Sequence, residues 1–320
     1  MIRSALVLLC VLLTGCAQAP APPRGESVTV TNCGAPAAFP VRPRLFVNDG
    51  SMIATVLALG ADDRIVAVSS LTPDRTELRR RLGERVDRLR EVAPTYPSSL
   101  ENVLASRPTM MFAGWGGGYS ESKGITPARL ARHGVAGYVR SDSCLRSEGG
   151  KRGTMDPWVA VRTDVQNLGA VLERREQATQ VVGDLDRRLD ALRADRLPGP
   201  APSIFVYNLG TDAPVTGGHF GSVQGIIDAA GGQNIFADAD TSWLTGSWER
   251  VIGRDPDVIV LLDRPDRPVA AKEQYLRADP RLRTLRAVRE NRLVTMPYVL
   301  WTSGVLNIDA AEELHAVLPR

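Results

Sequence analysis

One stretch of the chain, residues 173–197, limits the possible fold more than any other. Its apolar residues recur at steps of three and four, which places them in one narrow stripe on an α-helix, while Arg, Asp and Glu cover most of the remaining surface. The stripe consists of Val181, Val182, Leu185, Leu189 and Leu192. A helix of about 20 residues is roughly 30 Å long, the diameter of a small domain. We therefore interpret it as a helix that joins two lobes and only grazes each of them. A surface helix of a single α/β domain is the alternative.

Strand-like and helix-like segments alternate on both sides of this helix, and a strand, a helix and a second strand in succession favour a parallel sheet. The first half predicts strands at 44–47, 64–68, 108–113 and 135–140, and helices at 51–59, 100–106, 126–133 and 158–172. The second half predicts strands at 203–207, 258–262 and 292–296, and helices at 222–230 and 307–318. The predicted fold class is α/β, with two lobes, each a mainly parallel sheet flanked by helices, joined by one long interdomain helix. The expected boundaries are 1–15 for a signal peptide, 16–40 for a tether and the start of the first lobe, 41–172 for that lobe, 173–197 for the helix and 198–320 for the second lobe.

The start of the chain has the pattern of an export signal. Arg3 precedes an apolar run, residues 5–13, which is too short to span a bilayer. The sequence Leu-Thr-Gly-Cys that ends at Cys16 resembles the lipobox of bacterial lipoproteins, so Cys16 is the predicted lipidation site, and a plain signal peptide cut elsewhere is the alternative. Residues 17–25 are rich in Pro and small residues, as in a semi-stiff tether. We expect an extracytoplasmic protein that a lipid on Cys16 holds to the outer face of the cell membrane.

Of the four cysteines, one pair remains after export and lipidation. Cys10 departs with the signal and Cys16 carries lipid, so Cys33 and Cys144 remain in an oxidising compartment and are predicted to form a disulfide. A bond that closes a loop of about 110 residues would stabilise the first lobe by roughly 3 to 5 kcal/mol. A metal site is the competing idea, but two cysteines without a neighbouring histidine do not make one.

Composition and motifs exclude several functions. Hydrophobic residues make up 43% of the chain and charged residues 23%, as in a folded, water-soluble protein, and a net charge of +3 is too small to indicate nucleic-acid binding. Three scattered histidines argue against a site for a bare metal ion, so no metal ligands and no cofactor are predicted. The chain has no HExxH motif, and in residues 221–225 the serine stands one place too early for GxSxG. We therefore expect that the protein is not an enzyme.

Ordered motifs on both sides of the long helix carry a family resemblance. The second half contains GGQNIFAD at 231–238, Trp243, SWERV at 247–251 and RDPDVIV at 254–260. The first half contains LALG at 57–60, DRIV at 63–66, LENVLA at 100–105 and Arg-Pro at 107–108. This set resembles the helix-linked substrate-binding proteins of ABC importers, the family that binds ferric siderophores, haem and cobalamin. The chain departs from many relatives at Ile53-Ala54, where they carry Thr-Glu, and in its Asn-Cys-Gly start.

The resemblance implies a monomeric, lipid-anchored receptor that delivers an iron complex, a ferric siderophore or a similar chelate or macrocycle, to the membrane subunits of an ABC importer. Cobalamin, haem or a deazaflavin precursor are alternative ligands. A structural or regulatory lipoprotein of the same fold, without transport, is a further alternative.

Aromatic residues and arginines are the side chains that such a ligand needs, because it offers flat conjugated faces and a few anionic edges. Trp115 follows directly on a predicted buried strand, and parallel sheets bind ligands at the carboxyl ends of their strands. Trp243 and Trp301 match cleft aromatics in the family that the chain resembles. We predict that these three tryptophans line one cleft between the lobes. Further candidates are Tyr119, Tyr207 and His219, and also Arg140 and Arg152 for an anionic ligand.

Two acids stand at matching places in the two halves. Glu101 and Glu249 each lie at the start of a predicted helix, where the helix dipole favours a carboxylate whatever its function. The family resemblance adds a role, since the corresponding acids dock against arginines of the two membrane subunits. Charge pairs of this kind set orientation and association rate more than affinity.

Overall fold

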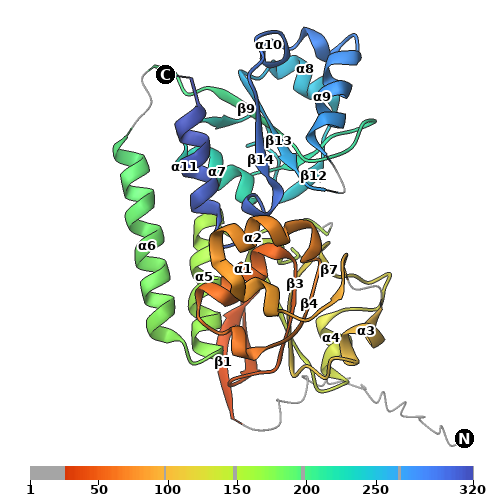
Figure 1. The fold of residues 1–320 in the computed structure, drawn as a ribbon, viewed down its shortest axis with the longest axis vertical. Helices are drawn as coiled ribbons and strands as arrows, with labels where there is room; N and C mark the ends of the chain where they lie inside the picture. Colours follow the sequence, from red (N-terminus) through yellow and green to blue (C-terminus); the bar gives the residue numbers. More distant parts are fainter. Residues whose placement is uncertain (1–25, 97–98, 147–149, 196–198, 266–267, 320) are drawn as a thin grey trace, which may run out of the picture.

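Short apolar strands from the first half of the chain form one parallel sheet. The computed structural model describes residues 26–96, 99–146, 150–195, 199–265 and 268–319 (Figure 1). The six-stranded sheet has the order β5-β4-β3-β6-β7, and β8 also pairs with β6. Its two central strands, β3 and β6, are buried along almost their whole length, as expected for a sheet with helices on both faces. The strands are β3 (Leu45–Asn48), β4 (Ile65–Ser69), β5 (Glu91–Ala93), β6 (Met110–Trp115), β7 (Gly118–Tyr119) and β8 (Ala136–Val139).

A second parallel sheet comes from the other half of the chain. Its order is β11-β9-β13-β14, with the apolar strand β13 at the centre. The strands are β9 (Ser203–Tyr207), β11 (Gln233–Asn234), β13 (Val258–Asp263) and β14 (Leu293–Pro297). A separate antiparallel pair, β10 (Val215–Gly217) and β12 (Trp243–Thr245), lies beside it. The predicted α/β class, with two lobes built on parallel sheets, is confirmed.

Side-chain caps start many of the helices that cover these sheets. Ser99, Thr126, Asp156 and Ser247 each accept a hydrogen bond from a backbone N–H in the first turn. The first lobe has α1 (Gly50–Ala58), α2 (Arg75–Leu82), α3 (Leu100–Leu104), α4 (Pro127–Ala131) and α5 (Pro157–Val171). The second lobe has α7 (Ser222–Ala229), α8 (Trp248–Arg254), α9 (Val269–Ala278), α10 (Arg286–Arg289) and α11 (Asn307–Val317).

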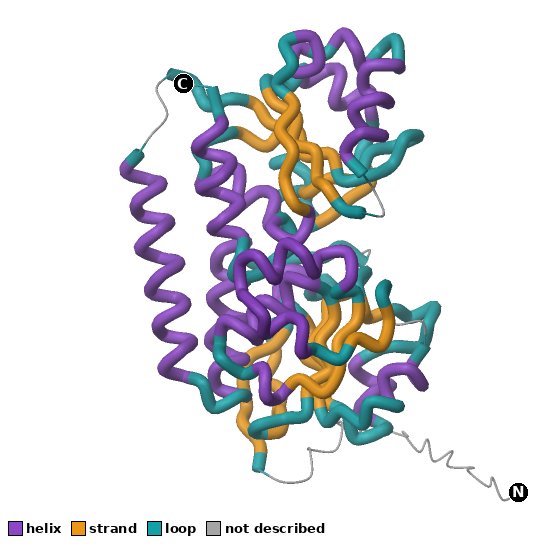
Figure 2. Tube along the Cα trace, in the orientation of Figure 1, coloured by secondary structure: helices purple, strands orange, loops and turns teal. Residues whose placement is uncertain are grey.

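The joining helix is α6 (Arg175–Ala194), which Figure 2 shows running alongside both lobes. The expectation that it only grazes its neighbours is wrong, because α6 packs along α5 and also contacts α11 and α7. The ion pair of Arg162 with Asp186 adds a polar link between α5 and α6. The apolar stripe is narrow, but α5 is close enough to bury it. Leu185, Leu189 and Leu192 of the stripe are buried, as is Ala178 nearer the start of the helix.

Two more helices connect the lobes beside α6. The indole N–H of Trp158, at the start of α5, donates to the carbonyl of Gly225 in α7 across 3.0 Å. From the second lobe, Asp309 of α11 accepts from Arg81 of α2 at 2.7 Å and from Arg188 of α6 at 2.6 Å. One carboxylate thus joins the first lobe, the joining helix and the second lobe.

A β-hairpin precedes the first lobe, and its strands are β1 (Ser27–Asn32) and β2 (Ala35–Pro40). Residues 16–40 were predicted as a tether and the start of the lobe, so the hairpin was not foreseen. Its two-residue turn, Cys33-Gly34, has φ of 51° and 78°, both positive as a tight hairpin turn requires. The side chain of Asn32 fixes the hairpin to β8, since it donates to the carbonyl of Val139 at 2.7 Å and accepts from its N–H at 3.0 Å.

The predicted disulfide is confirmed. Cys33 and Cys144 are bonded, with Cα atoms 5.3 Å apart, and Cys144 is fully buried. The bond ties the hairpin turn to the segment that follows β8. Within the described residues, no helix is long and apolar enough to cross a bilayer. The predicted signal peptide 1–15 and Cys16 lie outside the described part of the chain.

A buried carboxylate fixes the loop after β8. Asp164 of α5 is 4% exposed and accepts hydrogen bonds from the Tyr138 hydroxyl at 2.8 Å and from the Ser141 hydroxyl at 2.7 Å. Burial raises the pKa of Asp164 to about 7, and these hydrogen bonds offset only part of that effect. Ser141 begins the turn that continues to Cys144, so its hydrogen bonds to Asp164 hold the start of this turn in place.

We predict that Asp164 makes the protein less stable as pH rises from about 4 to about 7. In this window the folded chain keeps the Asp164 proton while the unfolded chain has lost it, so the folded state binds more protons and the free energy of unfolding falls. The slope from one group is at most about 1.4 kcal/mol per pH unit. Urea denaturation of wild type and Asp164→Asn across this range measures it. Equal pH slopes for the two proteins would contradict the prediction.

Candidate ligand site between the lobes

Loops that follow the strands of the two sheets contact each other. Arg264, directly after β13, donates from Nη2 to the hydroxyl of Ser70, directly after β4, at 3.4 Å. The start of α1 is equally close to the second lobe, because a Cβ added at Gly50 would lie 2.8 Å from a methyl of Val299. Ligands of parallel sheets bind at the carboxyl ends of the strands. The inter-lobe boundary is therefore the place to look for a site.

The first lobe supplies buried charges to this boundary. Asp49 follows β3, Asp74 follows β4, and Arg140 and Asp142 follow β8, and all four side chains are at most 9% exposed. Arg140 donates from Nε to Asp142 at 2.5 Å and from Nη1 to the Ser51 hydroxyl at 3.4 Å. Burial alone would lower the pKa of Arg140, but the charges of Asp142 and Asp49 outweigh it and raise that pKa. This arginine stays charged and paired.

Two tyrosines complete the polar boundary. The Tyr96 hydroxyl donates to Asp49 at 3.3 Å and also shares a hydrogen bond with Tyr298 of the second lobe. Burial, with the nearby Asp49 carboxylate, raises the pKa of Tyr96 to about 12. Burial also raises the pKa of Tyr298. Both phenols keep their protons at neutral pH, so each can donate a hydrogen bond.

A glycine-rich turn brings Trp115 to the same boundary. The Trp115 ring is half-buried and lies 5.8 Å from the ring of Tyr119, and its carbonyl accepts from Arg152 Nη1 at 3.0 Å. The next residue, Gly116, has φ of 78°, and a Cβ there would lie 2.2 Å from Arg152 Nη1. Only glycine therefore lets the Arg152 guanidinium approach the backbone so closely.

Arg152 also reaches the second lobe. Its N–H donates to the Thr241 hydroxyl at 3.4 Å, and its carbonyl accepts from the N–H of Ser242 at 2.9 Å. Trp243, the next residue, is half-buried on β12. One arginine thus joins Trp115 of the first lobe to the strand that carries Trp243.

The six predicted ligand-binding residues fall into two groups. Trp115, Trp243 and His219 retain exposed surface near the boundary, and the His219 ring packs edge-on against Phe220 at 4.8 Å. Tyr119, Tyr207 and Trp301 are buried, at 1%, 2% and 0% exposure. The tyrosine hydroxyls donate to backbone carbonyls, Tyr119 to that of Met111 at 2.9 Å and Tyr207 to that of Gly210 at 3.1 Å. The three predicted tryptophans therefore do not share one exposed surface here.

Comparison with known proteins identifies the family. Residues 47–300 match the family model described as periplasmic binding protein. The chain belongs to the periplasmic binding protein family. A vitamin B12-binding protein of Yersinia pseudotuberculosis serotype O:3 (strain YPIII) is 26% identical over 204 residues, 64% of this chain and 64% of that protein. The match thus spans less than two thirds of the length of the curated relatives.

Solved structures share the fold. A periplasmic binding protein from Veillonella parvula DSM 2008 superposes with a TM-score of 0.75 at 22% identity, covering 92% of this chain and 98% of that one. The Fe3+-hydroxamate transport protein of Saccharomonospora viridis DSM 43017 gives 0.73 at 23% identity, covering 91% and 98%. The periplasmic vitamin B12-binding protein of Vibrio cholerae gives 0.64 at 18% identity, covering 87% and 97%.

The members of this family share a general activity. They are extracytoplasmic, bind small solutes and work with the permeases of ABC transporters, and they are not enzymes. The predicted family membership is confirmed. Within the described residues, no group of three or more His, Cys, Asp or Glu side chains could hold a metal ion.

Several boundary residues were not foreseen from sequence. Asp49, Arg264 and Tyr298 each follow a strand directly, and Trp115 ends one, so the strand-end rule that selected Trp115 could have found them. Tyr96 lies in an irregular loop and carries no such signal. The predicted docking acids Glu101 and Glu249 are both exposed at the starts of α3 and α8.

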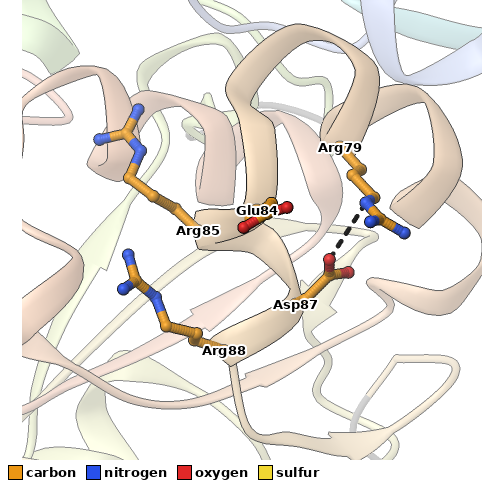
Figure 3. Close-up of a pocket in the computed structure, with 5 residues that line it drawn as sticks. All are labelled: Arg79, Glu84, Arg85, Asp87 and Arg88. Carbon is orange, nitrogen blue, oxygen red and sulfur yellow. Dashed lines mark ion pairs between the residues drawn. The ribbon is translucent and has the colours of Figure 1, made fainter.

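Two concavities lie away from the boundary. Figure 3 shows one of about 500 Å³, lined by Arg79, Glu84, Arg85, Asp87 and Arg88, in which Arg79 pairs with Asp87 at 3.1 Å. Another, of about 360 Å³, lies between α2, α6 and α11 and includes the ion pairs of Asp309. Neither concavity is at the carboxyl ends of the sheets, so we assign no ligand to them.

The stretch beside Arg152 forms a clasp between the lobes, which we call the Cys144 segment, residues 144–146 and 150–153. Arg146 donates from Nη1 to Asp240 of the second lobe at 2.8 Å, and Lys151 Nζ lies 3.4 Å from the other oxygen of that carboxylate. The Arg146 guanidinium also lies over the Phe220 ring at 4.9 Å. Asp240 thus holds two cations of the first lobe.

We predict that Asp240→Asn loosens the Cys144 segment. Arg146, Lys151 and Arg152 are trypsin sites within it, so limited trypsin digestion followed by mass mapping should show severalfold faster cleavage there. Added salt should have a similar effect on wild type, because exposed ion pairs are screened. Asp238→Asn is the matched control, since Asp238 pairs with Arg250 and Arg254 of its own lobe. Equal cleavage rates in Asp240→Asn and in the control would refute the clasp.

Proposed function

We propose that this binding protein captures a bulky metal complex, a ferric siderophore or a similar chelate or macrocycle, and delivers it to an ABC importer. The observation that carries the proposal is the inter-lobe boundary at the carboxyl ends of the first sheet. There Arg152 donates to the carbonyl of Trp115, and its own carbonyl accepts from Ser242, the residue before Trp243. Indole faces provide contact area for a flat conjugated ligand, and a guanidinium pairs with anionic edges.

Cobalamin is the second candidate ligand. The observation in its favour is the match to the vitamin B12-binding proteins, which extends over 204 residues. Haem and a deazaflavin precursor belong in the same test, because each is a large conjugated molecule. We further propose that the protein is a monomer held to the membrane by a lipid on Cys16.

Titration of the purified protein with this ligand panel tests the proposal. Binding should quench tryptophan fluorescence, and Trp115→Phe or Trp243→Phe should weaken binding by about 1 to 3 kcal/mol, the usual cost of losing a large aromatic contact. Trp248→Phe is the matched control, because this indole is buried and donates to the Thr211 carbonyl at 2.6 Å. Absence of binding across the panel would sink the proposal and leave a non-transport lipoprotein as the alternative.

Trp301 needs separate treatment in that experiment. Its ring is fully buried, and among the described residues its indole N–H has no hydrogen-bond partner. It can meet a ligand only when the lobes separate. Its proposed role therefore requires that Trp301→Phe alter ligand affinity and not only the free energy of unfolding.

We also propose that Glu101 and Glu249 dock against arginines of the two membrane subunits. Both carboxylates are exposed, and Glu249 forms an exposed ion pair with Arg281 at 3.6 Å. The double reversal Glu101→Arg and Glu249→Arg should abolish uptake while the ligand dissociation constant stays unchanged. Glu176→Arg, an exposed acid on α6, is the control and should transport normally. Normal uptake by the double reversal would show that docking lies elsewhere.

A further inference from the structure

Arg264 belongs to the second lobe but places its head group in the first. It follows β13 directly and is only 5% exposed. Its Nη2 donates to the Ser70 hydroxyl of the first lobe at 3.4 Å, and the guanidinium lies 4.8 Å from the centre of the Tyr298 ring. A cation thus lies between an aromatic face of its own lobe and polar groups of the other.

The receiving pocket of the first lobe is lined with acceptors. Asp49, Ser70 and Asp74 follow β3 and β4 and are all at most 4% exposed. Asp74 packs against the start of α1, since a Cβ added at Gly50 would lie 2.6 Å from its Oδ2. Burial acts to lower the pKa of Arg264, but the charges of Asp74 and Asp49, with the nearby phenols, raise it overall. The pocket therefore stabilises the charged form of Arg264.

Buried carboxylates limit what else can occupy this pocket. Two carboxylates removed from water need N–H or O–H donors, or a cation, because an unpaired buried charge costs several kcal/mol. The oxygens of a carboxylate or a catecholate offer no donor and would add like charge. An ammonium group or a primary amide offers two or three N–H groups. The pocket therefore favours ligands that present N–H or O–H donors, whatever the rest of the ligand is.

We propose that Asp49, Ser70 and Asp74 form a ligand subsite that binds an N–H-bearing edge, cationic or primary amide, in exchange for the Arg264 guanidinium. In this structure the Arg264 guanidinium occupies the place that the ligand's N–H group would take. The subsite rests on the proposed function, since it requires a ligand that enters between the lobes. It adds a requirement for donors to the aromatic contacts of Trp115 and Trp243.

Matched pairs of ligands test the subsite. Ferrioxamine B carries a free ammonium, whereas the cyclic ferrioxamine E has the same three iron-binding hydroxamates without it. Cyanocobalamin carries primary amides, and its monocarboxylic acid derivative replaces one of them by a carboxylate. For the scaffold that binds, wild type should prefer the donor-bearing member by at least about tenfold, the usual effect of a hydrogen bond to a charged group.

Variants assign that preference to the pocket. Asp74→Asn should reduce it to near unity. The double variant Asp74→Asn with Arg264→Gln removes one carboxylate together with the cation that faces it, so it gives the same readout if the single variant folds poorly. Asp238 forms its ion pairs with Arg250 and Arg254 and not with the pocket residues. The control variant Asp238→Asn should therefore keep the full preference.

The outcomes separate the two proposals. Equal affinities for both members of a pair, or a preference that survives in the double variant, would overturn the subsite and leave the proposed function intact. Failure of every scaffold and every other ligand of the panel to bind would overturn both.

Discussion

The parallel direction of the strands is the constraint on which the rest of this structure depends. Parallel strands end at one edge of their sheet, so each lobe collects its strand-following loops on a single side, and in this chain those two sides meet. Charges delivered by those loops are buried between the lobes and must be paired. Arg140 pairs with Asp142 within one lobe, whereas Arg264 reaches across to the other. The charged side chains that hold the two lobes together are therefore also the polar groups of the candidate site.

Sequence patterns predicted the framework well because the framework is made by local, periodic burial. Strands such as β13 are short apolar runs, and the stripe on α6 has the spacing of a helix face. The disulfide was predictable from cysteine number and compartment, without any geometry. The hairpin before the first lobe was missed because both strands are largely exposed and β2 is rich in Ala and Pro, and because its link to β8 is a side-chain hydrogen bond of Asn32.

The candidate site was only partly predictable, because long-range packing decides which strand-end residues stay accessible. Trp115 and Trp301 both follow strands of parallel sheets, yet one ring is half-exposed and the other lies in the core. No local pattern separates them, since the difference comes from the fold of the residues around Trp301. Tyr96 shows the converse case, in which an irregular loop brings a phenol to Asp49, a residue far away in the sequence.

Under the proposed function, the triple connection between the lobes has a consequence for how a permease would distinguish ligand-bound from free protein. Because α5, α6 and α11 each touch both lobes, and one carboxylate of α11 joins all three parts, a hinge in this region has little freedom to bend. A protein stiffened in this way would change little in overall shape when it binds a ligand. The information would instead be local: a few side chains at the rim exchange partners, and the permease reads a pattern of charge at nearly constant shape.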